Sequence, residues 1–372
     1  MDGAEVANCA DANVVHDAVI PCTCIDEVVA SHQANVAVCD SVSPVPVEKR
    51  AMPPDLTALM VPVRDGACRL WVGRHQPPAL TDALPLLVCH GGPGVPSDYL
   101  FPLAEILQRP VIFFDQLGCG RSERPEPADQ EYSIAAFVGD LVAVIEALVA
   151  AAWIPLRDER PAYHLYGQSF GGILAFETLT ADAGPAPPRS LSLSNVPSSV
   201  PVLLEEVAAL LAGLGGDGTR FEATHICRAT PRPAPLLAAY VPGYPGSHWR
   251  GVEVIADWCV PEARLRSFTT PVLLLAAEHD FVTPRSMQGW QDLPNRHLVM
   301  LPGVHTMPCS RAPRPMERSW RRFSGTTRSE SFHSVSVARN RGRRSSPMTD
   351  GQQDSRGSCS SDHEAAQQCE AL

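Results

Sequence analysis

The stretch GQSFG, residues 167–171, decides how this chain of 372 residues folds. The apolar run 163–166 precedes it, and the helix-competent run 173–179 follows it. A G-x-S-x-G pattern between a strand and a helix is the sequence form of a nucleophile elbow, a tight turn that lifts a serine hydroxyl clear of a sheet. Small residues must flank the serine, because larger side chains would clash in such a turn. The stretch therefore predicts a strand, a sharp turn at Ser169 and a helix.

The stretch HGGPG, residues 90–94, follows the apolar run 84–89 and fits a second part of the same site. Acyl transfer places negative charge on a carbonyl oxygen in the transition state, and that charge needs backbone N–H donors that already point at it. The loop after an early strand supplies one donor, and the residue after the nucleophile supplies the other. We assign these donors to Gly92 and Phe170. Taken alone, HGGPG would fit an ordinary turn after a strand equally well.

Acidic residues and a histidine lie just beyond later predicted strands. Glu278 and Asp280 follow the predicted strand 272–276, and His305 follows the next one. Open α/β sheets place functional groups at such strand ends, and the order Ser, Asp, His is that of α/β-hydrolases. We interpret Ser169 as the nucleophile, His305 as the base that takes its proton and Asp280 as the carboxylate that holds the imidazole. Glu278 is the alternative acid, but the Asp-x-x-Thr-Pro turn favours Asp280.

Three segments together resemble the proline iminopeptidase family of α/β-hydrolases. They are HGGPGVPSDYLFPLAEILQRPVIFFDQLGCGRS (90–122), YGQSFGGILAFETL (166–179) and SLSNVPSS (192–199). Within the first segment, we expect Asp115 and Arg121 to brace a loop rather than to do chemistry. The resemblance runs from about Leu56 to His305. It implies no cofactor, a helical cap that sets specificity, and removal of an N-terminal residue, often proline, from short peptides or amino-acid amides.

The cap departs from the pattern of this family. Family members carry cap carboxylates that bind the α-ammonium of the substrate, one of them in a Gly-x-x-Glu-Phe stretch. The aligned stretch here, 246–249, lacks that glutamate. Glu222 and Glu253 remain as substitutes, and Trp249 is a further candidate for substrate binding. After His305 the family continues into a helix that covers the last strand, and here a low-complexity tail stands in its place.

The alternation of predicted strands and helices indicates a mainly parallel sheet after an antiparallel opening hairpin. We expect an α/β-hydrolase fold, a mostly parallel eight-stranded sheet with helices on both faces and a short helical cap insertion. Along the chain this gives a disordered leader (1–54), a first core part (55–196), the cap (197–268), a second core part (269–309) and a disordered tail (310–372).

Composition excludes several functional classes. The net charge of −11 and the pI near 5.5 argue against a nucleic-acid-binding surface. No apolar run of about twenty residues is present to span a membrane, and the N-terminus lacks the features of a signal peptide. The 12 cysteines are scattered, which favours a cytoplasmic protein. Cys22 and Cys24 match no standard zinc spacing, so we expect no metal. The expected partner is a small peptide, amino-acid amide or ester.

Three functions remain open at this point. The first is a serine aminopeptidase that forms an acyl-enzyme on Ser169. The second is an esterase or amidase for small acyl compounds, which the missing cap glutamate favours. The third is a catalytically weak remnant or a binding module, which the short cap and the missing final helix favour. Ester and free-amine substrates discriminate the first two, and a serine-directed fluorophosphonate separates the third from both.

Overall fold

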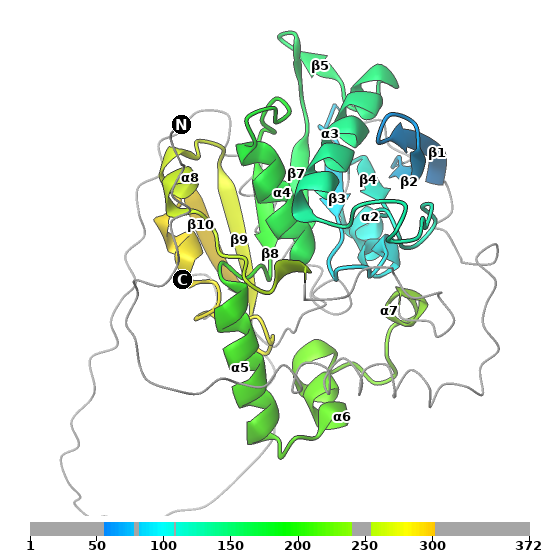
Figure 1. The fold of residues 1–372 in the computed structure, drawn as a ribbon. Helices are drawn as coiled ribbons and strands as arrows, with labels where there is room; N and C mark the ends of the chain where they lie inside the picture. The colour runs from blue at the N-terminus through cyan, green and yellow to red at the C-terminus, as the bar shows by residue number, and fades with distance from the viewer. Residues whose placement is uncertain (1–55, 78–81, 108, 240–253, 302–372) are drawn as a thin grey trace, which may run out of the picture. The chain divides into compact units, whose positions relative to one another are not determined.

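The computed structural model describes residues 56–77, 82–107, 109–239 and 254–301 (Figure 1). The predicted leader 1–54 and the predicted tail 310–372 lie outside these residues. Among the helices that the structure describes, none combines the length and the apolar character needed to cross a membrane.

An eight-stranded sheet forms the centre of the fold, with the strand order β1-β2-β4-β3-β7-β8-β9-β10. The pairs β1–β2 and β2–β4 are antiparallel, and all other neighbouring pairs are parallel. This confirms the predicted α/β-hydrolase fold. The strands are β1 (Leu56–Val63), β2 (Cys68–His75), β3 (Leu86–Cys89), β4 (Val111–Phe114), β7 (His164–Gln168), β8 (Leu191–Ser194), β9 (Val272–Ala277) and β10 (Arg296–Leu301).

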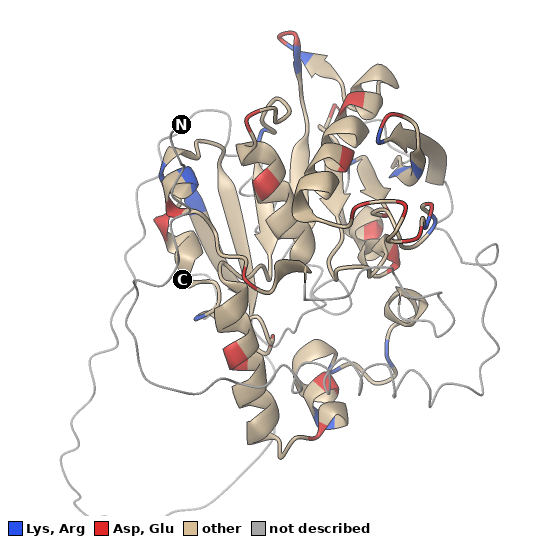
Figure 2. Cartoon of the chain, viewed as in Figure 1, with Lys and Arg blue, Asp and Glu red and all other residues tan. Residues whose placement is uncertain are grey.

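The five central strands are short and buried along their whole length. Their sequences, LLVC, VIFF, HLYGQ, LSLS and VLLLAA, contain no Lys, Arg, Asp or Glu, and Figure 2 shows them uniformly tan. Because both faces of these strands are covered, even the polar residues of β7 and β8 are buried.

Hydrophobic cores lie on both faces of the sheet, because neighbouring residues of a strand point to opposite sides. Leu87 of β3 packs into the core that includes residues of α3 and α4. Leu86 and Val88 of the same strand pack into the core that includes residues of η3 and α2. The elements concerned are η3 (Ser97–Leu100), α2 (Pro102–Ile106), α3 (Ile134–Ala150) and α4 (Phe170–Thr180).

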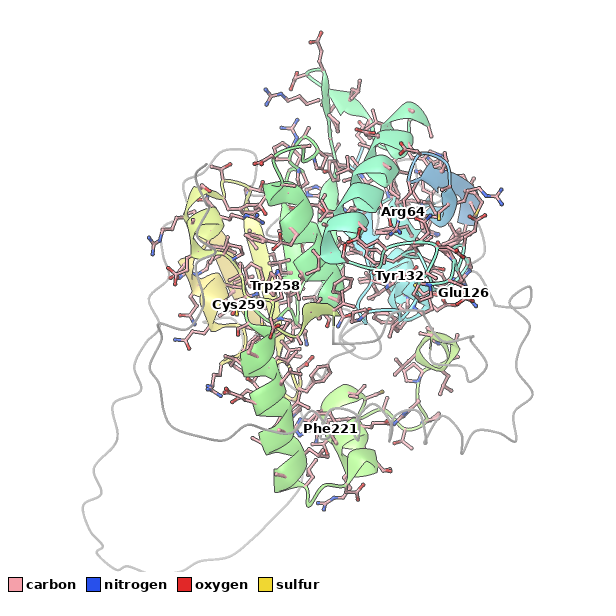
Figure 3. All side chains as sticks on the ribbon, in the orientation of Figure 1. Arg64, Glu126, Tyr132, Phe221, Trp258 and Cys259 are labelled. Atoms are coloured by element: carbon pink, nitrogen blue, oxygen red, sulfur yellow. The ribbon has the colours of Figure 1, made fainter. Side chains whose placement is uncertain are left out.

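The segments by which the chain enters the cap (198–200) and leaves it (258–260) lie side by side and are hydrogen-bonded to each other. The N–H of Val200 donates to the carbonyl of Trp258 over 2.9 Å, and the N–H of Val260 donates to that of Ser198 over 2.8 Å. Trp258 and Cys259 lie beside the top of α5 in Figure 3. The described cap elements are α5 (Val200–Gly213), α6 (Gly218–Phe221), the π-helical turn η4 (Glu222–Ile226) and α7 (Ala234–Ala239).

Helix α8 (Glu262–Ser267) falls within the range 197–268 that was predicted as cap, yet it packs with the core. Its residue Leu265 is fully buried in the core cluster that contains Phe176 and Trp290. Arg264 on the same helix pairs with Glu177 of α4 over 2.7 Å. The helix therefore leads the chain back to β9.

Candidate active site

The stretch GQSFG forms the sharp turn that the sequence predicts. Ser169 lies between β7 and α4 with φ 51° and ψ −124°, a backbone conformation that residues other than glycine rarely adopt. Gln168 and Phe170 are buried, whereas Ser169 is partly exposed. A side chain at Gly171 would clash with the carbonyl groups of the β3 end, so glycine allows α4 to begin directly against that strand. The serine is thus presented at the carboxyl edge of the sheet.

The two predicted oxyanion donors lie on segments that meet at Ser169. Gly92 follows β3, has φ 120° and is exposed, while its neighbour Gly91 is buried. A carbon atom added to Gly91 would stand only 3.1 Å from Cβ of Ser169. Phe170 is the first residue of α4, where backbone N–H groups lack an intrahelical acceptor. The oxyanion role of both residues remains a prediction.

Asp280 is buried just beyond β9, and both of its carboxylate oxygens accept hydrogen bonds. Its Oδ1 accepts from the N–H of Val282 over 2.7 Å, and its Oδ2 accepts from the Nδ2 of Asn195. Only 4% of Asp280 is exposed. By contrast, the side chain of Glu278 is 53% exposed and lies 3.9 Å from His279. This geometry favours Asp280 over Glu278 as the acid of the site.

Asn195 is a site residue that the sequence reasoning missed. It follows β8 directly, has φ 52°, and its N–H donates to the carbonyl of Leu275 on β9 over 2.8 Å. The signal was present, because the segment SLSNVPSS places Asn195 just past a strand end, as Asp280 is. Ser169, Asn195 and Asp280 therefore follow the successive neighbouring strands β7, β8 and β9.

The remaining predicted residues have different outcomes. His305, Trp249 and Glu253 lie outside the described residues. Glu222 is described: it is buried in the cap, and Arg232 donates a hydrogen bond from Nη2 to its Oε2 over 2.6 Å. The turn that carries Glu222 also contacts the loop of Asp280, since Nδ1 of His225 lies 3.1 Å from the carbonyl oxygen of His279.

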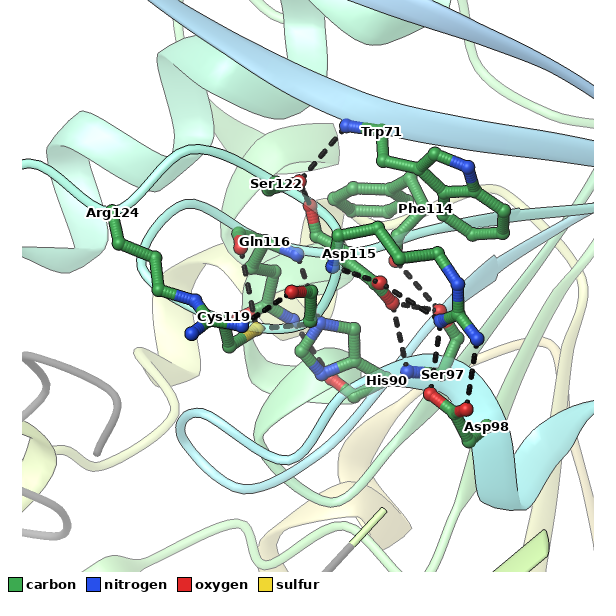
Figure 4. Close-up of polar contacts among 12 residues, drawn as sticks. Trp71, His90, Ser97, Asp98, Phe114, Asp115, Gln116, Cys119, Ser122 and Arg124 are labelled. Carbon is green, nitrogen blue, oxygen red and sulfur yellow. Dashed lines mark hydrogen bonds and ion pairs between the residues drawn. The ribbon is translucent and has the colours of Figure 1, made fainter. Parts of the chain in front are cut away.

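A buried ionic network supports the loop DQLGCGRS, residues 115–122 (Figure 4). Arg121 donates to both carboxylate oxygens of Asp98, over 3.0 and 2.8 Å, and to Oδ2 of Asp115 over 3.2 Å. Its guanidinium also lies 4.8 Å from the ring centroid of Trp71. Burial alone would raise the pKa of Asp115, but Arg121, His90 and hydrogen bonds from Ser97 outweigh it and lower that pKa. The prediction that Asp115 and Arg121 brace this loop is confirmed.

His90 connects this network to the HGGPG loop. Its Nε2 accepts from the N–H of Gln116 over 2.9 Å, so its proton lies on Nδ1, 2.9 Å from the carbonyl oxygen of Gly91. The side chain of Gln116 donates back to the carbonyl of His90 over 2.8 Å. Burial lowers the pKa of His90, which favours the neutral ring that this arrangement requires.

Known proteins resemble this chain in sequence and in fold. A proline iminopeptidase of Lactobacillus delbrueckii subsp. lactis is 28% identical over 263 residues, covering 61% of this chain and 85% of that relative. The crystal structure of a proline iminopeptidase from Mycobacterium smegmatis matches with a TM-score of 0.59 and 29% identity, covering 73% of this chain and 98% of its own. These matches confirm the resemblance to proline iminopeptidases.

Other matches extend to the wider fold. A thermophilic esterase from Thermogutta terrifontis has a TM-score of 0.55 and 18% identity, covering 73% of this chain and 100% of its own, which is a likeness of fold alone. The sequence model of the Alpha/beta hydrolase family matches residues 86–324. That match spans more than half of the chain and includes the elbow, Asn195 and Asp280, so the protein belongs to the alpha/beta hydrolase family.

Proposed function

We propose that this protein is a serine hydrolase that removes an N-terminal residue, preferably proline, from peptides or amino-acid amides. One observation carries the proposal. The strained, partly exposed Ser169 follows β7, and the buried Asp280, which accepts hydrogen bonds from Val282 and Asn195, follows β9, two strands away in the same sheet. An exposed serine and a buried, oriented carboxylate are the first and last members of a Ser–His–Asp triad.

In the proposed reaction, the Oγ of Ser169 attacks the carbonyl carbon of the first residue of the substrate. His305 accepts the hydroxyl proton and then delivers it to the leaving amine, while Asp280 stabilises the imidazolium. The backbone N–H groups of Gly92 and Phe170 stabilise the oxyanion. The acyl-enzyme is then hydrolysed by water, with His305 acting as base for the second time.

Peptidase specificity needs a group that recognises the free α-ammonium of the substrate. An ammonium buried without a partner is costly, so a carboxylate should face it. Glu222 is the described candidate, since its turn contacts the loop of Asp280, and Glu253 is the second. The similarity to proline iminopeptidases supports this substrate class.

A second candidate function is hydrolysis of small esters or amides by the same Ser169. The ion pair between Arg232 and Glu222 favours it, because the carboxylate is already neutralised. An ester substrate without a free amine would leave this pair intact.

The experiment compares three substrates: a proline arylamide, an N-blocked proline arylamide and a short-chain aryl ester. Ser169→Ala serves as the control for background hydrolysis. Serine-dependent turnover of only the free-amine arylamide supports the aminopeptidase, and turnover of only the ester supports the second candidate. If a folded sample hydrolyses none of them and does not react with a fluorophosphonate, both enzyme proposals fail.

A further inference from the structure

Tyr99 joins the two backbone segments that converge on Ser169. It lies in η3, and only 4% of it is exposed. Its hydroxyl oxygen accepts a hydrogen bond from the N–H of Gly91 over 2.7 Å. The same hydroxyl donates to Oε1 of Gln168 over 2.6 Å. Gly91 immediately precedes Gly92, and Gln168 immediately precedes Ser169, so one hydroxyl links the oxyanion loop to the nucleophile elbow.

We propose that the hydroxyl of Tyr99 is a positioning group that fixes the distance between the two oxyanion donors, the N–H groups of Gly92 and Phe170. The inference rests on the proposed function, because it assigns these donors to an oxyanion hole. Oxyanion donors are effective only when they are held in place before charge develops. A single hydroxyl that accepts from one segment and donates to the other provides such a constraint.

Water would be a poor replacement for this hydroxyl. Gly91 is buried, and Gln168 is only 2% exposed. A side chain at Gly91 would clash with the carboxamide of Gln168, so the two segments are already in close contact. Removing the hydroxyl would therefore take away the partner of the Gly91 N–H and of the side-chain Oε1 of Gln168, which both belong to buried residues. The two segments would then relax relative to each other.

The turn η3, which carries Tyr99, has neighbours on two sides. Within the same turn η3, Ser97 donates its N–H to Oδ1 of Asp115 over 2.9 Å, and Asp98 is held by Arg121. On the other side, Leu236 of α7 belongs to the same core cluster as Tyr99. The turn η3 thus lies between the buried ionic network and helix α7 of the cap.

The test compares Tyr99→Phe with the matched control Tyr163→Phe. Tyr163 is also buried, and its hydroxyl makes a 3.1 Å hydrogen bond to the carbonyl of Ala186, next to the opposite end of β7 from Ser169. Both variants lose one buried hydroxyl, but Tyr99→Phe breaks two hydrogen bonds and Tyr163→Phe breaks one. Urea denaturation should therefore show a loss of stability in both variants, and the larger loss in Tyr99→Phe. The main measurement is the rate of Ser169 labelling by a fluorophosphonate, which needs the oxyanion donors but no particular substrate.

We expect Tyr99→Phe to slow labelling by about 10-fold or more, less than the 10²–10³-fold cost of deleting a donor outright. With an active substrate, kcat should fall by a similar factor while KM changes less than about twofold, because ground-state binding is untouched. Tyr163→Phe should match the wild type in both measurements. Equal labelling rates for the two variants would overturn the inference.

A second variant guards against misfolding of Tyr99→Phe. Gln168→Met removes the acceptor from the other side and should slow labelling to a similar extent; an unchanged rate would overturn the inference. Failure of the proposed function looks different. In that case the wild type hydrolyses none of the three substrates. The labelling rate of Tyr99→Phe relative to that of the wild type still tests the role of Tyr99. A wild type that is folded but never labelled overturns both proposals.

Discussion

Asn195 donates a hydrogen bond from its Nδ2 to Oδ2 of Asp280, and thereby connects the ends of β8 and β9. Both residues are buried, and 85 positions separate them in the sequence. The N–H of Asn195 is itself tied to the carbonyl of Leu275. The backbone of the sheet thus fixes the amide, and the amide fixes the carboxylate. In a Ser–His–Asp triad, the orientation of the carboxylate determines the orientation of the histidine.

The first prediction removes this amide without disturbing the backbone. Asn195→Gly introduces a glycine, which readily adopts the φ of 52° found at this position. We expect kcat/KM to fall by about 10- to 100-fold, because a hydrogen bond to a charged group contributes about 1.5–3 kcal/mol.

The control for this prediction is Asn295→Gly. The Nδ2 of Asn295 also donates a hydrogen bond, but to the carbonyl of Thr269 over 3.0 Å, and Asn295 is exposed and precedes β10. Its removal should leave kcat/KM unchanged. If Asn195→Gly retains wild-type kcat/KM over the whole pH range, the amide does not orient Asp280.

The second prediction concerns recognition of the substrate amine. Glu222→Gln should raise KM for a proline arylamide by about tenfold or more, because the α-ammonium would then face an uncharged amide instead of a carboxylate. Hydrolysis of a short-chain ester should not change. Glu262→Gln is the control, since Glu262 pairs with Arg266 on the surface of α8. A parallel loss on both substrates would mean that Glu222 supports the cap instead of binding the amine.

Much of the sheet could be predicted from the sequence. The predicted strand 272–276 matches β9 to within one residue, and the apolar runs 84–89 and 163–166 overlap β3 and β7. Short apolar runs bounded by polar or turn residues leave little choice of boundaries. The hairpin β5–β6 (Leu156–Arg157 and Arg160–Pro161) was missed. Its turn residues Asp158 and Glu159 have φ 52° and 62°, and this pair lacks the glycine that usually marks such a turn.

The site was predictable only in part. Ser169 and Asp280 lie next to strand ends, which a local pattern can identify. The roles of Asn195 and Tyr99 depend on contacts with residues 85 and 69 positions away, and no local pattern specifies those contacts. The same holds for Glu222, whose pairing with Arg232 depends on how the cap folds. Side-chain partners arise from tertiary packing, whereas strand and turn positions arise from neighbouring residues.

The third prediction tests the buried ionic network. Arg121→Met would leave the carboxylates of Asp98 and Asp115 without their guanidinium, in a region where the side chains of these acids are 3% and 0% exposed. Breaking a buried pair in this way costs about 3–5 kcal/mol of unfolding free energy. Arg266→Met breaks a pair whose side chains are 73% and 74% exposed, and should have little measurable effect. Urea denaturation of both variants checks the prediction, which fails if their losses are equal.

The fourth prediction concerns the effect of pH on stability through His164. This residue begins β7, and its Nδ1 lies 2.7 Å from Oγ of Ser190. Burial, with smaller contributions from Arg109 and Arg189, lowers the pKa of His164 to about 3. The folded protein therefore keeps the ring neutral, while the unfolded chain takes up a proton near pH 6.5. The stabilisation is fully present above that pH and is lost as the pH falls below it.

The size of this effect follows from the two pKa values. Between pH 7.5 and pH 5, His164 alone should lower the unfolding free energy by about 2 kcal/mol, since each pH unit below the unfolded pKa costs about 1.4 kcal/mol. His164→Asn keeps a polar side chain but does not titrate. Urea denaturation at both pH values should therefore show a pH-dependent loss about 2 kcal/mol smaller in the variant than in the wild type. His90 titrates in both proteins and cancels from this difference, so equal losses would mean that His164 does not stay neutral in the folded state.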